Sequence, residues 1–137
     1  MVLVDTTVWS LALRRRAPDL SGHEQRLVAH FYHLVRESQV RLLGATRQEI
    51  LSGIREESQF QRIREYLRAF DNVQLSVEDY EEAARMSNRC KRSGIATSST
   101  DMLICAVSGL RGWQILSTDR DFAHYSQVLS IQIHPHL

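Results

Sequence analysis

Two short apolar segments of the sequence end in acidic residues, and this placement raises a question of chemistry. Residues 2–9 read VLVDTTVW, with Asp5 after the apolar run, and residues 115–122 read ILSTDRDF, with Asp119 and Asp121 after a similar run. A carboxylate at the buried end of a strand must find a hydrogen-bond donor or a cation. We therefore expect these acids to form a site at one edge of a sheet.

Two further acids stand where helices are expected to begin. Glu49 follows the hydroxyl residue of the segment TRQE, and Asp101 lies in the first turn of the apolar segment STDMLICAV. Carboxylates within about 4 to 6 Å of one another raise each other's pKa, so a cluster is unfavourable without a cation. Oxygen ligands of high charge select a hard ion such as Mg²⁺ or Mn²⁺ rather than zinc. The four segments together predict a metal site.

Each acid also has a purely structural interpretation. Glu49 fits the third helical position of a capping box begun by Thr46, and Asp101 could cap a helix together with Ser98. Asp121 could cap a local turn. These alternatives stay open at the level of sequence, and the set of acids is a stronger argument than any member.

The fourth position of the site is ambiguous between two acids. Asp119 directly follows the expected strand, as Asp5 follows its own. Asp121 lies two residues further, about 6 to 7 Å along an extended chain. We therefore expect Asp119 to be the ligand and keep Asp121 as an additional acid.

Strand and helix signals alternate along the chain. Strands are expected at residues 2–4, 40–43, 72–75, 114–117 and 129–133, and helices at 6–13, 21–38, 46–52, 59–70, 76–94 and 98–109. Parallel neighbours need crossover helices, and right-handed crossovers cover both faces of a sheet. The expected class is α/β, a three-layer α/β/α fold with a central parallel sheet. In such sheets, ligands bind at the carboxyl ends of the strands.

Length and composition bound the other possibilities. The 137 residues, 43% of them hydrophobic, suit one domain spanning residues 1–137. No apolar run approaches the roughly 18 residues of a membrane helix, and no signal peptide is recognised, so we expect a soluble, cytoplasmic protein without a membrane partner. Cys90 and Cys105 are expected to be buried free thiols.

The positive charge is almost entirely arginine. Of 17 basic residues, only Lys91 is a lysine, which would suit phosphate recognition, although a GC-rich genome also favours arginine codons. Setting aside the five candidate acids leaves 17 basic and 11 acidic residues, a balance of +6. Arg14, Arg15 and Arg16 are candidates for binding RNA, and a solvated charge run is the alternative.

The chain resembles the PIN-domain ribonucleases, and in particular the VapC toxins of bacterial toxin-antitoxin pairs. The resemblance rests on four segments in register: DTTVW at 5–9, QEILSG at 48–53, SSTDMLICAVS at 98–108 and ILSTDRDF at 115–122. It covers nearly the whole chain. The presence of acids at both 119 and 121 departs from the pattern and leaves the fourth position open.

The resemblance implies a Mg²⁺-dependent endoribonuclease, with Mn²⁺ as a substitute, that is usually dimeric and is held inactive by a small antitoxin. It implies catalytic roles for Asp5, Glu49, Asp101 and Asp119, with Asp5, Asp101 and Asp119 as metal ligands. A catalytically silent RNA-binding or interaction module of the same fold is the alternative, although such modules have usually lost an acid.

Several other polar side chains are weaker candidates. Thr6, Ser117 and Thr118 could orient water or carboxylates, or could simply cap helices and turns. His30 and His33 are three residues apart on an expected helix, a spacing that could suit a metal, but two histidines without a further ligand are more typical of an ordinary surface.

Overall fold

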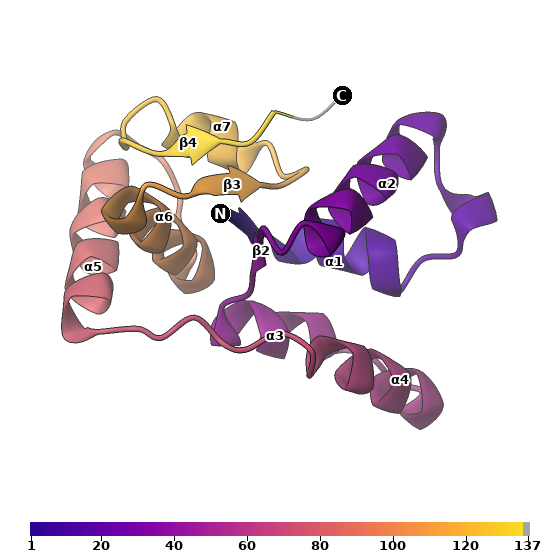
Figure 1. Ribbon diagram of the computed structural model, residues 1–137. Coiled ribbons are helices and arrows are strands. Elements are labelled where there is room, and N and C mark those ends of the chain that lie inside the picture. Colours follow the sequence, from indigo (N-terminus) through magenta and orange to yellow (C-terminus); the bar gives the residue numbers. More distant parts are fainter. Residues whose placement is uncertain (136–137) are drawn as a thin grey trace.

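The computed structural model describes residues 1–135 and contains a four-stranded parallel sheet with helices packed on both faces (Figure 1). The strand order is β2-β1-β3-β4, and every neighbouring pair is parallel. The strands are β1 (Val2–Val4), β2 (Val40–Arg41), β3 (Gln114–Leu116) and β4 (Gln132–Ile133). This arrangement confirms the three-layer α/β/α class.

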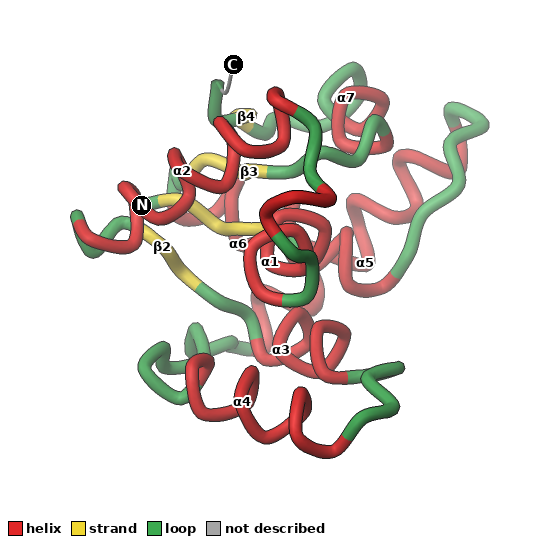
Figure 2. Tube along the Cα trace, turned by 90° about the vertical axis from the view of Figure 1, so that its right-hand side faces the viewer, coloured by secondary structure: helices red, strands yellow, loops and turns green. Residues whose placement is uncertain are grey.

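The helices occupy most of the described chain. They are α1 (Thr6–Leu13), α2 (Gly22–Arg36), α3 (Gly44–Leu51), α4 (Glu57–Leu67), α5 (Val77–Arg92), α6 (Ser99–Arg111) and α7 (Asp121–Tyr125), with a short 3-10 helix η1 (Ala17–Asp19). Figure 2 shows α2 beside the sheet and α3 with α4 below it. Within residues 1–135, no helix combines the length and apolar character needed to cross a bilayer.

Alternation along β1 supplies the two hydrophobic cores. Val2 and Val4 belong to a cluster with Trp9 and Phe31, from α1 and α2. Leu3 belongs to a second cluster on the opposite face, built mainly from α5 and α6. Because successive strand residues point to opposite faces, three apolar residues are enough to join both layers. The central strand must therefore be buried on both sides.

The structure differs from the expected elements mainly at residues 72–75 and 121–125, and it also adds η1 and shortens the last strand to Gln132–Ile133. The strand expected at residues 72–75 is reduced to an isolated bridge between Leu42 and Asn72. The Arg47 side chain holds the start of this segment against α3, because it donates to Asn72 Oδ1 at 2.8 Å and to the carbonyls of Leu67 and Phe70. The short helix α7 was not expected from the sequence.

Both cysteines are free and buried, as predicted. Cys90 lies on α5 and Cys105 on α6, each fully buried in the same core. Burial raises the pKa of each thiol above its usual value. Since the thiolate is the reactive form, both groups behave as small apolar core residues.

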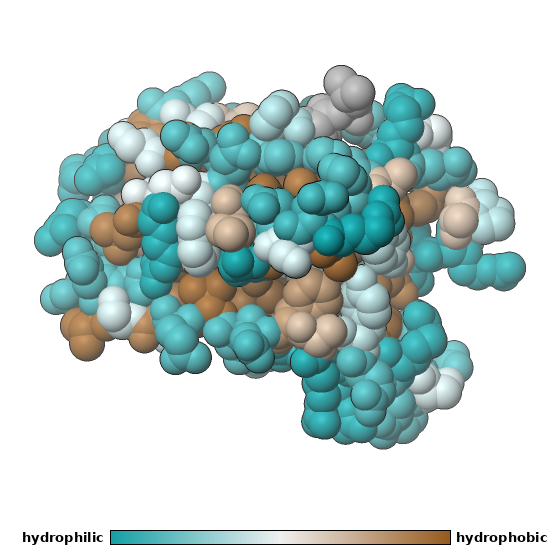
Figure 3. Space-filling view, in the orientation of Figure 1, coloured by the Kyte–Doolittle hydropathy of each residue, from teal (hydrophilic) through white to brown (hydrophobic). Residues whose placement is uncertain are grey.

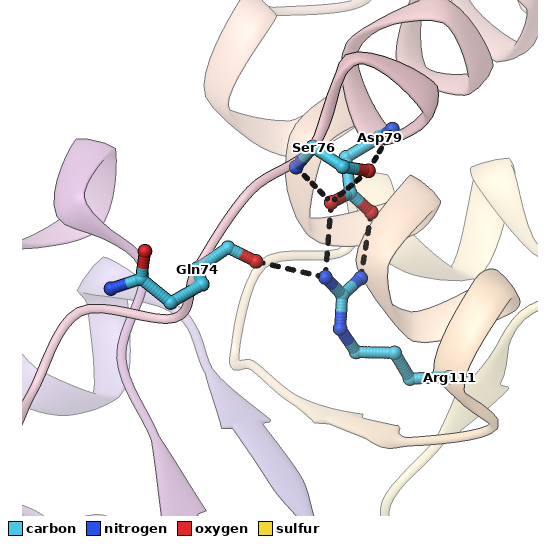
Figure 4. Close-up of polar contacts among 4 residues, drawn as sticks. All are labelled: Gln74, Ser76, Asp79 and Arg111. Atoms are coloured by element: carbon cyan, nitrogen blue, oxygen red, sulfur yellow. Dashed lines mark hydrogen bonds and ion pairs between the residues drawn. The ribbon is translucent and has the colours of Figure 1, made fainter.

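One buried ion pair fixes α6 against α5. Arg111, in the last turn of α6, donates to both oxygens of Asp79 at 2.6 and 3.0 Å and to the carbonyl oxygen of Gln74 (Figure 4). Asp79 also accepts from the backbone of Ser76 in a capping box. The hydrogen bonds from Arg111, with those from Ser76, lower the pKa of Asp79 to about 2. This pair orients the helix that carries Asp101.

Replacing Asp79 by Asn should destabilise the protein at pH 7 by about 1.5 to 3 kcal/mol, the usual contribution of hydrogen bonds to a charged group. The lowered pKa means that this contribution is present above pH 3.8 and is lost as the pH falls through about 2. Denaturant unfolding at pH 7 and pH 3 measures it, and the difference between the two proteins should shrink at pH 3.

Glu82→Gln is the matched control. Its partner Arg85 is 68% exposed, so breaking that pair should cost less than about 1 kcal/mol. Equal losses in the two variants would contradict the structural role of the Asp79 pair.

Candidate active site

Asp5 lies at the carboxyl end of β1 and is only 5% exposed. The register that pairs Val4 with Leu116 brings Ser117 alongside it, and Ser117 Oγ donates to Asp5 Oδ2 at 2.8 Å. Thr7 Oγ1 donates to the same oxygen at 3.0 Å. Asp5 occupies the N-cap position of α1 but makes no side-chain capping bond. Its carboxylate is committed to the site rather than to the helix.

The loop after β3 is built on the same hydroxyls. Ser117 Oγ accepts from the backbone N–H of Asp119 at 2.9 Å, and Thr7 Oγ1 accepts from that of Thr118 at 3.2 Å. Asp119 Oδ1 in turn accepts from the backbone N–H of Asp121 at 2.9 Å. Ser117 therefore links Asp119 to the carboxylate at the end of the neighbouring strand.

Asp101 meets this loop from the other side of the sheet. Ser98 Oγ caps α6 by accepting from the backbone N–H of Asp101, as its structural interpretation required. The Asp101 carboxylate is nevertheless aimed elsewhere, because Tyr125 OH donates to its Oδ2 at 2.8 Å. Carboxylate oxygens of Asp101, Asp119 and Asp121 lie within 4.8 Å of one another. The capping and site interpretations of Asp101 are therefore compatible.

The carboxylates of the site influence one another electrostatically, as the pKa of Asp101 shows. Burial, as the main cause, raises the pKa of Asp101 to about 6. The hydrogen bond from Tyr125 opposes this shift, whereas the negative charges of Asp5 and Asp119 add to it. Burial and the bond to Asp101 likewise raise the pKa of the Tyr125 hydroxyl. Such a cluster gains free energy when a cation compensates its charge.

Glu49 stands at the rim of the group. It lies on α3, and its Oε1 accepts from Thr6 Oγ1 at 2.9 Å. The capping interpretation does not hold, because Leu43 is the N-cap of α3 and Thr46 is buried within the helix. Glu49 is not among the three acids that approach one another most closely. Its link to α1 still holds it near Asp5.

The path of the chain after β3 differs from the expected one. Asp121 was expected to be carried away along an extended segment, but the chain curls and α7 begins at that residue. The three acids closest to one another are therefore Asp101, Asp119 and Asp121, whereas Asp5 of the expected ligand set lies beside them, held by hydroxyls. Tyr125, one turn further along α7, was not recognised from the sequence.

The donor set fits a hard divalent ion. All its converging groups are carboxylate oxygens, and oxygen ligands suit Mg²⁺ and Mn²⁺ better than zinc. Three side chains converging from α6, the loop after β3 and the start of α7 leave room for water in the remaining positions, as Mg²⁺ usually requires.

A cleft leads away from these acids along α1 and α4. Its inner end is formed by Thr7 and Thr118, Glu24 lies in its wall, and Arg14, Arg15 and Gln59 also line it. The adjoining hollow shares these last three residues and adds Arg16, Arg62 and Glu56, so arginines outnumber acids in both. The surface over α4 is hydrophilic (Figure 3). The three arginines noted in the sequence are all exposed: Arg14 and Arg15 line both the cleft and the hollow, and Arg16 lines the hollow.

Comparisons with known proteins agree with this architecture. A sequence model of the PIN domain matches residues 2–128. FitAcB from Neisseria gonorrhoeae has a similar structure, with a TM-score of 0.74 and 20% identity over 98% of both chains. VapBC2 from Rickettsia felis bound to a promoter DNA fragment has a TM-score of 0.72 and 9% identity over 98% of both chains. VapBC-5 from Mycobacterium tuberculosis has a TM-score of 0.67 and 18% identity, over 96% of this chain and 94% of that chain. It is a member of the VapBC family of toxin-antitoxin systems.

A comparison with curated protein sequences found no match. At these identities, the similar structures establish the fold, and the match to the sequence model establishes the family.

Asp101→Asn should raise the melting temperature of the metal-free protein at pH 8. The pKa of Asp101 in the folded protein, about 6, lies above its ordinary value of 3.8. The contribution of this carboxyl group to the free energy of unfolding is therefore fully present below about pH 4 and is lost as the pH rises through 6. Asparagine removes this loss and can still accept the hydrogen bond from Tyr125. Thermal unfolding in EDTA at pH 4 and pH 8 measures the effect.

The exposed Asp71 supplies the control, since Asp71→Asn should change neither melting temperature by a comparable amount. A stabilisation by Asp101→Asn of the same size at both pH values would contradict the electrostatic explanation.

Proposed function

Because the chain belongs to the PIN domain family, we propose that it is a metal-dependent endoribonuclease of the VapC toxin type, acting in the cytoplasm. The observation that supports this most directly is the convergence of Asp101, Asp119 and Asp121 next to the buried Asp5. A silent binding module would have no need to keep like charges at this distance, because their repulsion costs stability.

A bound Mg²⁺ or Mn²⁺ would lower the pKa of a water molecule and neutralise charge that develops on the phosphate. In this proposal Asp101, Asp119 and Asp5 hold the ion, with Asp121 as an additional acid. Ser117 positions two of these groups, because it donates to Asp5 and accepts from the backbone of Asp119.

The remaining groups orient the carboxylates. Tyr125 fixes the Oδ2 atom of Asp101. Thr6 does the same for Glu49, which we propose as a catalytic acid at the rim, positioned to orient water. Thr118 contributes its backbone N–H to the Thr7 hydroxyl, which holds the loop against α1.

The basic cleft is the proposed path of the RNA. The acids repel the phosphate backbone, so substrate binding needs positive charge nearby. Arg14, Arg15 and Arg16 supply it from the loop after α1, and Arg62 faces them from α4. Arginine also pairs with phosphate in a two-point geometry that lysine does not match.

A small antitoxin is the proposed regulator. Phe31 on α2 is fully buried against Trp9, so its side chain is not available to contact an antitoxin helix. Growth arrest on induction, relieved by coexpression of a small protein encoded next to this chain, tests this part of the proposal; arrest that no such protein relieves would contradict it.

A homodimer is also part of the proposal. Val77 and Tyr80 at the start of α5 are 75% and 56% exposed, and Figure 3 shows apolar surface on the side of the molecule that lies between α5 and α3. A second copy could cover such surface. Sedimentation velocity measures the state, and a monomer at all concentrations would rule this out.

The purified chain should degrade RNA with Mg²⁺ or Mn²⁺ and should be inactive in EDTA. Asp119→Asn should lower the rate at least about a hundredfold, a loss of roughly 2.7 kcal/mol of transition-state stabilisation. Asp121→Asn should cost less, because Asp119 is tied through Ser117 to Asp5. Cleavage of a labelled RNA pool, followed with both variants side by side, measures these rates.

Cleavage that persists in chelator would exclude the metal-dependent reaction. An inactive Asp121→Asn beside an active Asp119→Asn would exchange the roles of the two acids. Folding of each variant is checked by its circular dichroism, so that loss of activity is not mistaken for loss of structure.

The double variant Arg14→Ala, Arg15→Ala should raise KM for RNA several-fold and leave kcat nearly unchanged. It removes sequence-independent phosphate contacts, and each lost contact should reduce the slope of log KM against log salt by about 0.7. Arg92→Ala, at the exposed end of α5, is the matched control. A similar rise in KM for both proteins would show that the cleft is not the RNA path.

A further inference from the structure

Three histidines gather where α2 meets the last strand, on the opposite side of the sheet from α6. His30 and His33 lie three residues apart on α2, which alone is a weak metal-binding pattern. The structure brings in His134, which follows β4: its Nε2 lies 2.8 Å from Nε2 of His30, although the residues are 104 apart in sequence. The further ligand that the helix pattern lacks is therefore supplied by a distant segment.

The ring of His134 is held in the form that binds metals. Its Nδ1 lies 2.6 Å from Oε1 of Gln114, an acceptor, so Nδ1 carries the hydrogen and Nε2 carries the lone pair. Its backbone N–H donates to the carbonyl of Ile115 at 2.7 Å, which fixes the residue against β3. Metal-binding histidines usually have such a hydrogen bond on the second nitrogen, which orients the ring.

The two rings meet tip to tip. Their planes differ by only 17° and their centroids are 5.1 Å apart, so the line between the centroids runs through both Nε2 atoms. The ring of His33 follows at 6.3 Å from that of His30, nearly parallel to it and exposed to solvent. An exposed side chain can change rotamer, so a third imidazole is within reach of the same point.

We propose that His30, His33 and His134 form a second metal site, which takes a borderline ion such as Zn²⁺. Imidazole ligands select Zn²⁺, Ni²⁺ or Cu²⁺, whereas Mg²⁺ prefers oxygen. Two imidazole nitrogens on a tetrahedral Zn²⁺ lie about 3.3 Å apart, given Zn–N bonds of about 2.0 to 2.1 Å. The observed separation of 2.8 Å needs to open by about half an ångström, and the two rings must also tilt out of their end-to-end line so that both nitrogens point at one ion.

This site is separate from the acidic cluster. Gln114 begins β3, whereas the acids follow the other end of that strand, and α2 contributes none of them. A bound ion would connect α2 to the segment after β4. These two segments lie next to each other, as the contact between His30 and His134 requires (Figures 1 and 2). The β4 strand has only two residues, so a metal clamp would stabilise the edge of the sheet.

The test is a titration of the purified full chain with Co²⁺, a spectroscopic substitute for Zn²⁺, in excess Mg²⁺ that occupies the acidic site. Wild-type protein should bind one Co²⁺ per chain with visible absorption bands of imidazole coordination. His30→Gln and His134→Gln should each weaken binding at least about tenfold. The exposed His33→Gln should weaken it as well, and this variant leaves the His30–His134 contact in place.

His124→Gln is the matched control, because His124 is exposed on α7, next to the acidic cluster. It should leave Co²⁺ binding unchanged, as should Asp119→Asn. Zn²⁺ should also raise the melting temperature of the wild type and not that of His134→Gln, as expected for an ion that binds only the folded chain.

Equal Co²⁺ affinity in the wild type and in all three histidine variants would overturn the proposal. So would binding that disappears in Asp119→Asn, which would place the ion among the carboxylates. Neither outcome depends on RNA cleavage, so this proposal and the nuclease proposal can fail separately.

Discussion

The parallel register between β1 and β3 is the constraint on which the candidate site depends. Pairing of Val4 with Leu116 places the next residue of each strand, Asp5 and Ser117, at the same level of the sheet. A shift of one residue would turn the apolar side chains of β1 to the wrong faces, so both cores oppose it. The hydroxyl–carboxylate bond at the strand ends therefore follows from the packing of side chains that take no part in chemistry.

The site also requires two layers of the fold to meet. Asp5 and Glu49 lie on the side of α1 and α3, whereas Asp101 arrives on α6, whose position depends on the bidentate pair of Arg111 with Asp79. Tyr125 completes the connection by holding Asp101 from α7. The Arg111–Asp79 ion pair thus fixes the position of α6, whereas no cationic side chain neutralises the carboxylates of the candidate site among the contacts described above.

Sequence reasoning reached the α/β class and the strand-end acids because both depend on local patterns, an apolar run followed by a polar residue. Sequence reasoning was wrong where contacts between residues far apart in the sequence determine the path of the chain. Asn72 forms a single bridge and is held by an arginine 25 residues away, and Asp121 is turned back by the start of α7. The sequence contains no sign of the contacts of Tyr125, and it indicates a disordered tail at His134, because a partner 24 or 104 residues distant leaves no periodic signal.

The two buried thiols offer a way to observe motion of the scaffold. Cys105 lies on α6 one turn beyond Asp101, and Cys90 faces it from α5 in the same core. Alkylating reagents attack the thiolate, which burial disfavours here, so the folded molecule should be nearly inert to them. The rate of labelling then measures how often α5 and α6 separate, and therefore how often the helix that carries Asp101 leaves its packed position.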